Sequence, residues 1–179
     1  TRNSEELAGE VESRGGMLNA FSGFNSFGLH SRCLAPDADL FVGTISDCLL
    51  NPALLEREIA KQKAIQLAAI EEEHERPIFV AQEKLRELLF PGHPYRLHPL
   101  GRKDTVSKLD RPELLKQFRR HIVSGNAVIS IFGDISQNDA VRLAESHFGQ
   151  MPAGHALKVT CARAEPKLPA RAILHEPRE

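Results

Sequence analysis

Histidine and acidic side chains are the residues of this sequence best suited to bind a catalytic metal. A zinc hydrolase usually presents two histidines one helical turn apart, together with a carboxylate and a general base. None of the eight histidines has another histidine four residues away, and the residue four positions before His74 is Ile70. The run Glu71–Glu73 beside His74 is therefore predicted to be a solvated helix end. His93 and His98 are predicted to be loop residues that hydrogen-bond backbone groups rather than metal ligands.

Motifs for nucleophilic, nucleotide-binding and disulfide chemistry are missing from the sequence. It contains neither GxSxG nor the phosphate-binding patterns GxGxxG and GxxxxGK. The three cysteines, Cys33, Cys48 and Cys161, are widely spaced without a CxxC pair, which predicts buried free thiols. One tyrosine and no tryptophan leave few aromatic side chains for stacking on bases, so nucleic acid is not expected as a partner.

The bulk composition is that of a soluble globular domain. The 179 residues are 41% hydrophobic and 26% charged, and the net charge of -1 comes from interleaved acids and bases. No apolar run approaches the roughly 18–20 residues of a membrane helix, so no membrane contact is expected. These features predict a soluble protein of a bacterial-type periplasm or cytoplasm and leave the compartment unknown.

Hydrophobic periodicity and breaker residues predict an α+β fold in which helices cover a mostly antiparallel sheet. About four strands are expected, at Met17–Ser22, Phe27–Leu34, Asn126–Gly133 and Arg171–His175. Helices are expected from Asn3 to the glycines at 15 and 16, and over residues 36–50, 54–77, 78–90, 110–121 and 137–148. The long helix is expected to pack through Leu55, Ile59, Leu67 and Ile70. So few strands for so many helices suggest an incomplete sheet.

Five motifs follow one another along the chain in a recognisable order. They are SEELAGEVESRGGMLNAFSG (Ser4–Gly23), DCLLNP (Asp47–Pro52), FPGHPYRLHPLG (Phe90–Gly101), the strand and Gly-Asp of Ile129–Asp134, and HFGQMPAG (His147–Gly154). Together they resemble the pitrilysin or insulinase (M16) superfamily of zinc metallopeptidases. The resemblance implies a LuxS/MPP-like half-domain with a six-stranded, largely antiparallel sheet. It also implies that homologous domains pair into a clamshell around an enclosed peptide.

The resemblance also sets the expected extent of the domain. The whole chain is expected to be one M16-like domain that is N-terminally incomplete and lacks its first strands. Residues 155–179 are expected to form an extended tail and the start of the next strand. In active family members the zinc-binding HxxEH motif precedes the segment matched here by Ser4–Gly16.

One position of the long helix departs from the pattern of active family members. Their third zinc ligand is a glutamate eight residues before the proline that ends this helix. Pro77 ends the helix here, so the matching position is Ala69, whose methyl group cannot bind zinc. Glu73 lies one turn further on, about 6 Å along the axis. No catalytic residue and no metal ligand are therefore predicted in this chain.

The resemblance then implies a non-catalytic half, or subunit, of a zinc peptidase, inactive by itself. Its homologous partner, in the same chain or in a second subunit, would carry the zinc, and a homodimer is a further alternative. In the catalytic half a peptide adds to the strand matched here by Asn19, Ala20 and Phe21. His30 and Arg32 either face the chamber and bind the peptide or lie on a solvated sheet face. Two other functions stay open: an active zinc endopeptidase whose HxxEH lies upstream, and a structural scaffold subunit derived from a peptidase.

Overall fold

The computed structural model describes residues 4–158 and residue 173. Of the expected strand Arg171–His175 only Ile173 is described, so that prediction and most of the expected tail lie outside the described residues. The chain divides into two compact units, residues 1–55 with 112–157 and residues 56–111 with 158–179. Each unit has its own helices and its own buried apolar side chains.

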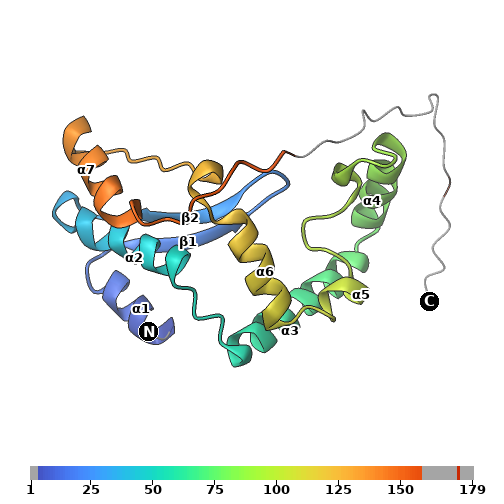
Figure 1. Ribbon diagram of the computed structural model, residues 1–179. Coiled ribbons are helices and arrows are strands. Elements are labelled where there is room, and N and C mark those ends of the chain that lie inside the picture. Colours follow the sequence, from blue (N-terminus) through green and yellow to red (C-terminus); the bar gives the residue numbers. More distant parts are fainter. Residues whose placement is uncertain (1–3, 159–172, 174–179) are drawn as a thin grey trace. The chain divides into compact units, whose positions relative to one another are not determined.

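The first unit contains an antiparallel hairpin and helices that cover it (Figure 1). α1 (Ser4–Glu12) is followed by Gly15, whose φ of +63° is the left-handed conformation that commonly terminates a helix. β1 (Met17–Ser22) and β2 (Phe27–Arg32) are joined by a tight turn, in which the Gly23 amide donates to the Ser26 carbonyl at 2.9 Å. Further elements are η1 (Ala35–Asp37), α2 (Ala38–Leu50), α6 (Arg111–His121), η3 (Ser124–Asn126) and α7 (Gln137–Phe148).

α2 is the central helix of this unit because it packs against both β2 and α7. Its Phe41 is only 1% exposed. The ring lies against Gly16 at the start of β1, where an added Cβ would come within 2.1 Å of a ring carbon. Gly43 similarly admits the His147 ring of α7, and the imidazole Nε2 lies 2.9 Å from Asp39 Oδ1. Two glycines thus allow the hairpin, α2 and α7 to approach closely.

The second unit is built on the long helix α3 (Glu56–His74). This helix packs against α4 (Pro77–Leu89) and the single turn α5 (Lys103–Val106). Ile70, Phe79 and Val106 are buried, with exposures of 3, 6 and 4%. These side chains come one from each helix, so they form the apolar centre of the unit.

Polar side chains of α3 hold the irregular stretch that follows α4 and includes η2 (Pro94–Arg96). The Lys63 ammonium donates to the carbonyls of Ser107 and Leu109 at 3.1 and 3.0 Å. The Gln66 amide donates to the Leu100 carbonyl at 2.7 Å. Carbonyl groups of an irregular segment therefore find partners on a rigid helix, as backbone groups away from water require.

The predicted fold class is confirmed, because helices cover an antiparallel sheet, but among the described residues that sheet has two strands. The predicted strand Asn126–Gly133 is wrong. Its first residue belongs to η3, and residues 127–132 form no strand. A strand needs a neighbour for its backbone hydrogen bonds, and the described residues supply none here. Val128 and Phe132, expected in a core, are each 92% exposed.

Three smaller features also differ from expectation. β2 ends at Arg32 rather than Leu34, and the turn α5 was not predicted. α3 begins at Glu56, and Leu55, expected to pack, is 40% exposed. The helix does pack as expected through the buried Ile70 and the half-buried Ile59 and Leu67.

No helix within the described residues is long and apolar enough to cross a membrane.

The burial of Phe41 predicts that the first unit depends on this one side chain. Phe41→Ala should lower the free energy of unfolding by about 3–5 kcal/mol, because it removes a buried ring and leaves a cavity. Urea unfolding followed by circular dichroism measures the loss. Leu34→Ala is the matched control, since Leu34 is 67% exposed and its truncation should change stability by less than about 0.5 kcal/mol. Equal losses in the two variants would contradict the central role of Phe41.

Candidate functional site

One face of the β1–β2 hairpin brings together most of the residues predicted to bind a peptide. The antiparallel register sets Met17 opposite Arg32 and Asn19 opposite His30. Directly opposed residues of an antiparallel pair point to the same face of the sheet, so these four side chains share one face. Phe21, two residues beyond Asn19, belongs to the same face because side chains alternate along a strand.

Aromatic and basic groups lie side by side on this face, which we call the hairpin face. The Phe21 ring lies over Gly28, where an added Cβ would be 3.1 Å from two of its carbons. The centroid of the same ring is 6.4 Å from that of His30. Met17 and Phe21 are 46 and 47% exposed, and Arg32 is exposed without an ion pair to any described residue. The hairpin face therefore offers apolar contact beside a guanidinium able to bind a carboxylate.

Ala20 lies on the opposite face of the hairpin, away from Asn19 and Phe21. Its register partner is Leu29, which is half-buried, as is the neighbouring Leu18. Ala20 can therefore contribute to the hairpin face only through its backbone. Met17 was missed by the sequence analysis, although alternation with Asn19 and Phe21 was the signal that could have identified it.

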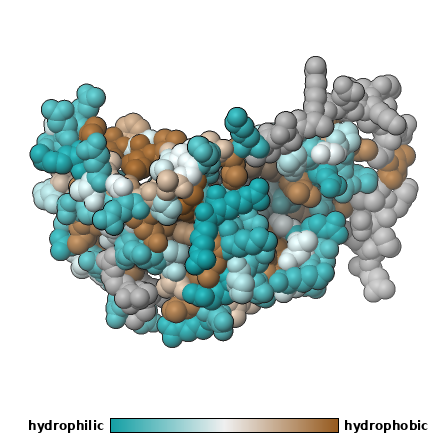
Figure 2. Space-filling model, in the orientation of Figure 1, coloured by the Kyte–Doolittle hydropathy of each residue, from teal (hydrophilic) through white to brown (hydrophobic). Residues whose placement is uncertain are grey.

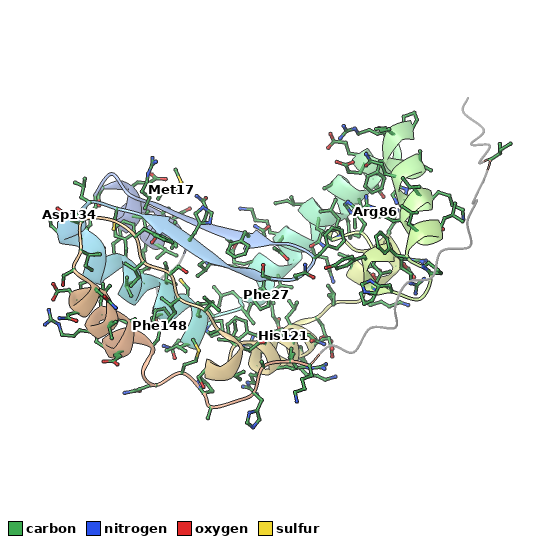
Figure 3. The ribbon with its side chains drawn as sticks, turned by 90° about the horizontal axis from the view of Figure 1, so that it is seen from above. Met17, Phe27, Arg86, His121, Asp134 and Phe148 are labelled. Carbon is green, nitrogen blue, oxygen red and sulfur yellow. The ribbon has the colours of Figure 1, made fainter. Side chains whose placement is uncertain are left out.

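Contacts at both ends hold the hairpin in the first unit. Arg14, just before β1, forms an ion pair with Asp37 in η1, with Nη1 and Oδ1 2.6 Å apart. At the other end, the ring of Phe27 meets that of His121 edge to face at 5.9 Å (Figure 3). These contacts anchor β1 and β2 to η1 and to the end of α6. The hairpin face is thus displayed on an anchored element rather than on a loop.

Ala69, which the sequence analysis expects at the position of a zinc ligand, lies on α3 in the second unit and is half-buried. Two of the three acidic residues that follow it, Glu71 and Glu73, are paired with cations. Glu71 forms an ion pair with Lys103 at 2.5 Å, and Glu73 forms one with Arg76 at 3.2 Å. The hydrogen bond from Lys103 lowers the pKa of the Glu71 carboxyl. These carboxylates therefore act as the ion-paired end of a helix.

His93 and His98 hydrogen-bond backbone groups of their own loop, which confirms that prediction. The Nδ1 atom of His93 accepts from the Tyr95 amide at 3.2 Å. The Nδ1 atom of His98 accepts from the Leu100 amide at 3.3 Å. Each Nδ1 atom thus accepts a hydrogen bond from an amide two residues further along the chain. In the neutral form of either ring the proton then lies on Nε2.

His98 also belongs to an aromatic cluster in the second unit. The buried Phe79 ring meets His98 edge to face at 4.8 Å and His74 at 5.3 Å. Burial lowers the pKa of His98 below its ordinary value of 6.5, and the positive charges of Arg86 and His74 act in the same direction. The carboxylates of Glu73 and Glu83 oppose this shift only in part.

The described residues do not assemble a metal site or a reactive thiol. Within residues 4–158 and 173, no three His, Cys, Asp or Glu side chains are grouped so as to hold a metal ion. Cys33 and Cys48 are free and half-buried, and burial together with the charge of Asp37 raises the pKa of the Cys33 thiol. A raised pKa disfavours the nucleophilic thiolate. Cys161 lies outside the described residues.

Two family profiles match the sequence, and together they cover nearly all of it. Residues 1–103 match the family described as Insulinase (Peptidase family M16). Residues 108–178 match the domain described as Peptidase M16 inactive domain. These matches confirm the family suggested by the sequence motifs.

Individual relatives are longer than this chain. A protein of Rickettsia bellii named as a zinc protease is 29% identical over 86% of the chain and 37% of its own length. The mitochondrial-processing peptidase subunit beta of Caenorhabditis elegans is 28% identical over 86% of the chain and 33% of its own length. The chain thus spans about a third of the length of these relatives.

A solved structure shows the same fold. The crystal structure of a peptidase M16 inactive domain from Pseudomonas fluorescens superposes with a TM-score of 0.82 at 20% identity. The match covers 92% of this chain and 40% of that one. The fold of this chain is therefore a known one.

The lowered pKa of His98 predicts that the protein loses stability as the pH falls below about 6.5. In that range the unfolded chain binds a proton at this imidazole more readily than the folded protein, so acid favours unfolding. His98→Gln should flatten the dependence of the unfolding free energy on pH below about 6.5, as measured by urea titrations at a series of pH values. His155→Gln, at an exposed position, is the control substitution. An unaltered dependence in His98→Gln would contradict the assignment.

Proposed function

The chain belongs to peptidase family M16, and from this premise we propose that it acts as a non-catalytic half of a zinc peptidase. In this role it pairs with a homologous half that binds zinc, closes the chamber around the peptide and helps to bind that peptide. The proposal concerns the whole protein. This chain covers about a third of the length of the relatives that it matches. The match of residues 108–178 to an inactive-domain profile supports it.

The observation that carries the proposal is Ala69 on α3. A zinc ligand needs a nitrogen, oxygen or sulfur donor, and alanine has none in its side chain. Two of the three acids that follow on the helix are already ion-paired, Glu71 with Lys103 and Glu73 with Arg76, and Glu72 is exposed. The residues around this position therefore do not fit a zinc ion, and the bond-breaking chemistry belongs to the partner half.

The contribution of this half is to bind and orient the peptide. The hairpin face offers the aromatic ring of Phe21 for apolar side chains and Arg32 for carboxylate or carbonyl oxygens. A peptide in extended conformation can also add to the edge of β1 through backbone hydrogen bonds. Contacts remote from the cleaved bond hold the peptide equally in the ground state and the transition state, so they lower KM and raise kcat/KM.

Two other functions are distinguished by experiment. The names of the relatives as zinc proteases favour an active peptidase as the second candidate, with Glu73 in place of the missing ligand. A scaffold subunit derived from a peptidase is the third. Full-length protein that forms a stable assembly with its homologous half, yet neither binds nor cleaves any peptide, would identify a scaffold.

The zinc content of Glu73 variants distinguishes a non-catalytic half from an active peptidase that uses Glu73 as a ligand. In full-length protein with its partner half, Glu73→Gln should leave both the bound zinc and the rate of peptide cleavage unchanged, because Glu73 pairs with Arg76 rather than with metal. Zinc is measured by atomic absorption and cleavage with a fluorogenic peptide. Glu72→Gln, at an exposed neighbouring position, is the matched control. Loss of zinc in Glu73→Gln but not in Glu72→Gln would overturn the non-catalytic assignment.

The role of the hairpin face is tested by steady-state kinetics of the paired halves. Phe21→Ala and Arg32→Ala should each raise KM about 3- to 10-fold with little change in kcat, since they remove contacts made equally in the ground and transition states. Ser22→Ala, on the other face of β1, is the control. An unchanged KM in both variants would show that the hairpin face is only a solvated surface.

A further inference from the structure

The β1–β2 hairpin carries a fixed charge at one end only. Residues 17–32 include no aspartate or glutamate, and Arg32 is the only lysine or arginine among them. The exposed Arg32 side chain makes no ion pair with a described residue. The first acid after it along the chain, Asp37, is already paired with Arg14 at 2.6 Å. The hairpin face therefore has one fixed positive charge, and the hairpin has no carboxylate to neutralise it.

The other end of the hairpin face is aromatic. The Phe21 ring, near the turn, has the His30 imidazole beside it, with 6.4 Å between the ring centroids. The register sets Arg32 opposite Met17, at the end of the hairpin away from the turn. Figure 3 labels Met17 and Phe27 at these two ends. A cation and an aromatic ring thus lie on the same face at separate positions.

Strand geometry fixes the distance between these two groups. Met17 and Phe21 are four residues apart on β1, which corresponds to about 13–14 Å in an extended strand. Side chains of an extended peptide alternate, so residues four apart point the same way and match this spacing in either chain direction. Arg32 lies one strand further, about 4.8 Å from β1, a distance that its long side chain can span. A peptide lying along β1 therefore places one side chain at Phe21 and another, four residues away, within reach of Arg32.

A guanidinium selects a carboxylate among the groups that a peptide offers. Its planar fork of N–H donors binds two carboxylate oxygens at once, and the opposite charges strengthen these hydrogen bonds. A backbone carbonyl is present at every residue of a peptide, so binding it favours no particular sequence. Figure 2 shows several apolar patches between hydrophilic residues, so apolar contact is not special to the hairpin face. Arg32 is therefore the residue of that face best suited to discriminate between peptides.

We propose that this half selects peptides that carry a carboxylate four residues from a large apolar side chain. Arg32 binds the carboxylate, and Phe21 contacts the apolar side chain. A glutamate or aspartate side chain and the C-terminus of a peptide are two sources of this group. The selectivity rests on the proposed function, because it requires that the hairpin face bind the peptide.

The experiment measures the Kd of labelled peptides by fluorescence anisotropy on full-length protein with its partner half, after a chelator has removed zinc so that the peptides stay intact. Each amidated peptide has a single leucine and either glutamate, glutamine or lysine four residues away on one side or the other. The glutamate peptide should bind about 2- to 5-fold more tightly than the glutamine peptide, as one exposed ion pair allows, and the lysine peptide should bind most weakly. Glutamate three residues from the leucine points to the other side of an extended peptide and should bind like glutamine. A glutamine peptide whose free C-terminus lies four residues from the leucine tests the second source of the carboxylate.

Charge reversal at position 32 tests the residue itself. Arg32→Glu should reverse the order, so that the lysine peptide binds most tightly, and Arg32→Gln should abolish the difference between glutamate and glutamine peptides. Arg120→Glu makes the same charge change at an exposed position of α6. It is the matched control and should keep the wild-type order. Unchanged circular dichroism spectra would show that the variants stay folded.

Failure of this selectivity and failure of the proposed function give different results. Equal binding of the glutamate, glutamine and lysine peptides to the wild-type protein would overturn the selectivity. If Phe21→Ala still weakens the binding of every peptide, the peptide-binding role itself stands. A preference for glutamate that persists in Arg32→Glu, or that is the same at every spacing, would overturn it too, since the selecting charge would then lie elsewhere. The proposed function fails if neither Phe21→Ala nor Arg32→Ala weakens the binding of any peptide.

Discussion

The first unit depends on the contact between Phe41 and Gly16. The ring of Phe41 is 1% exposed, and it occupies the space that any side chain at position 16 would need. This close approach fixes α2 against the start of β1. On α2, Gly43 contacts the His147 ring of α7, so α2 also positions α7. The hairpin face can be presented to a peptide only because its opposite face is held by this packing. A glycine and a phenylalanine far apart in the sequence thus determine where the candidate binding surface lies.

The second unit is governed by the register of one helix. Along α3 each residue rotates by about 100°, so a carboxylate displaced by two to four positions points elsewhere or lies further along the axis. The acids that follow Ala69 are therefore out of register with it, and two of them, Glu71 and Glu73, are paired with Lys103 and Arg76. The family membership and this single position are the basis of the proposal that the protein assists catalysis by a partner half. In that proposal the contribution of this chain is binding and orientation rather than bond breaking.

Sequence reasoning succeeded where the determining interactions are local. The helices and the hairpin were predicted to within a few residues because capping residues, prolines and periodicity act over one or two turns. The same reasoning failed at Asn126–Gly133, whose composition is that of a buried strand but whose neighbours are absent from the described residues. It also missed the single turn α5, which packs against α3. Leu55 was expected to pack because it is apolar, yet no described residue covers it fully.

By itself the sequence determined the family, the helix boundaries and the absence of a donor at position 69, since each can be read from residue types and their spacing along the chain. It also placed Asn19, Phe21, His30 and Arg32 on neighbouring strands. Only the tertiary structure decided that these four share one exposed face while Ala20 does not, because that depends on the register between β1 and β2. It alone decided as well that His98 is packed against Phe79 with a lowered pKa, and that residues 128–132 make no backbone hydrogen bond within the described part of the chain. Burial and pairing are properties of residues distant in sequence, and no local pattern specifies them.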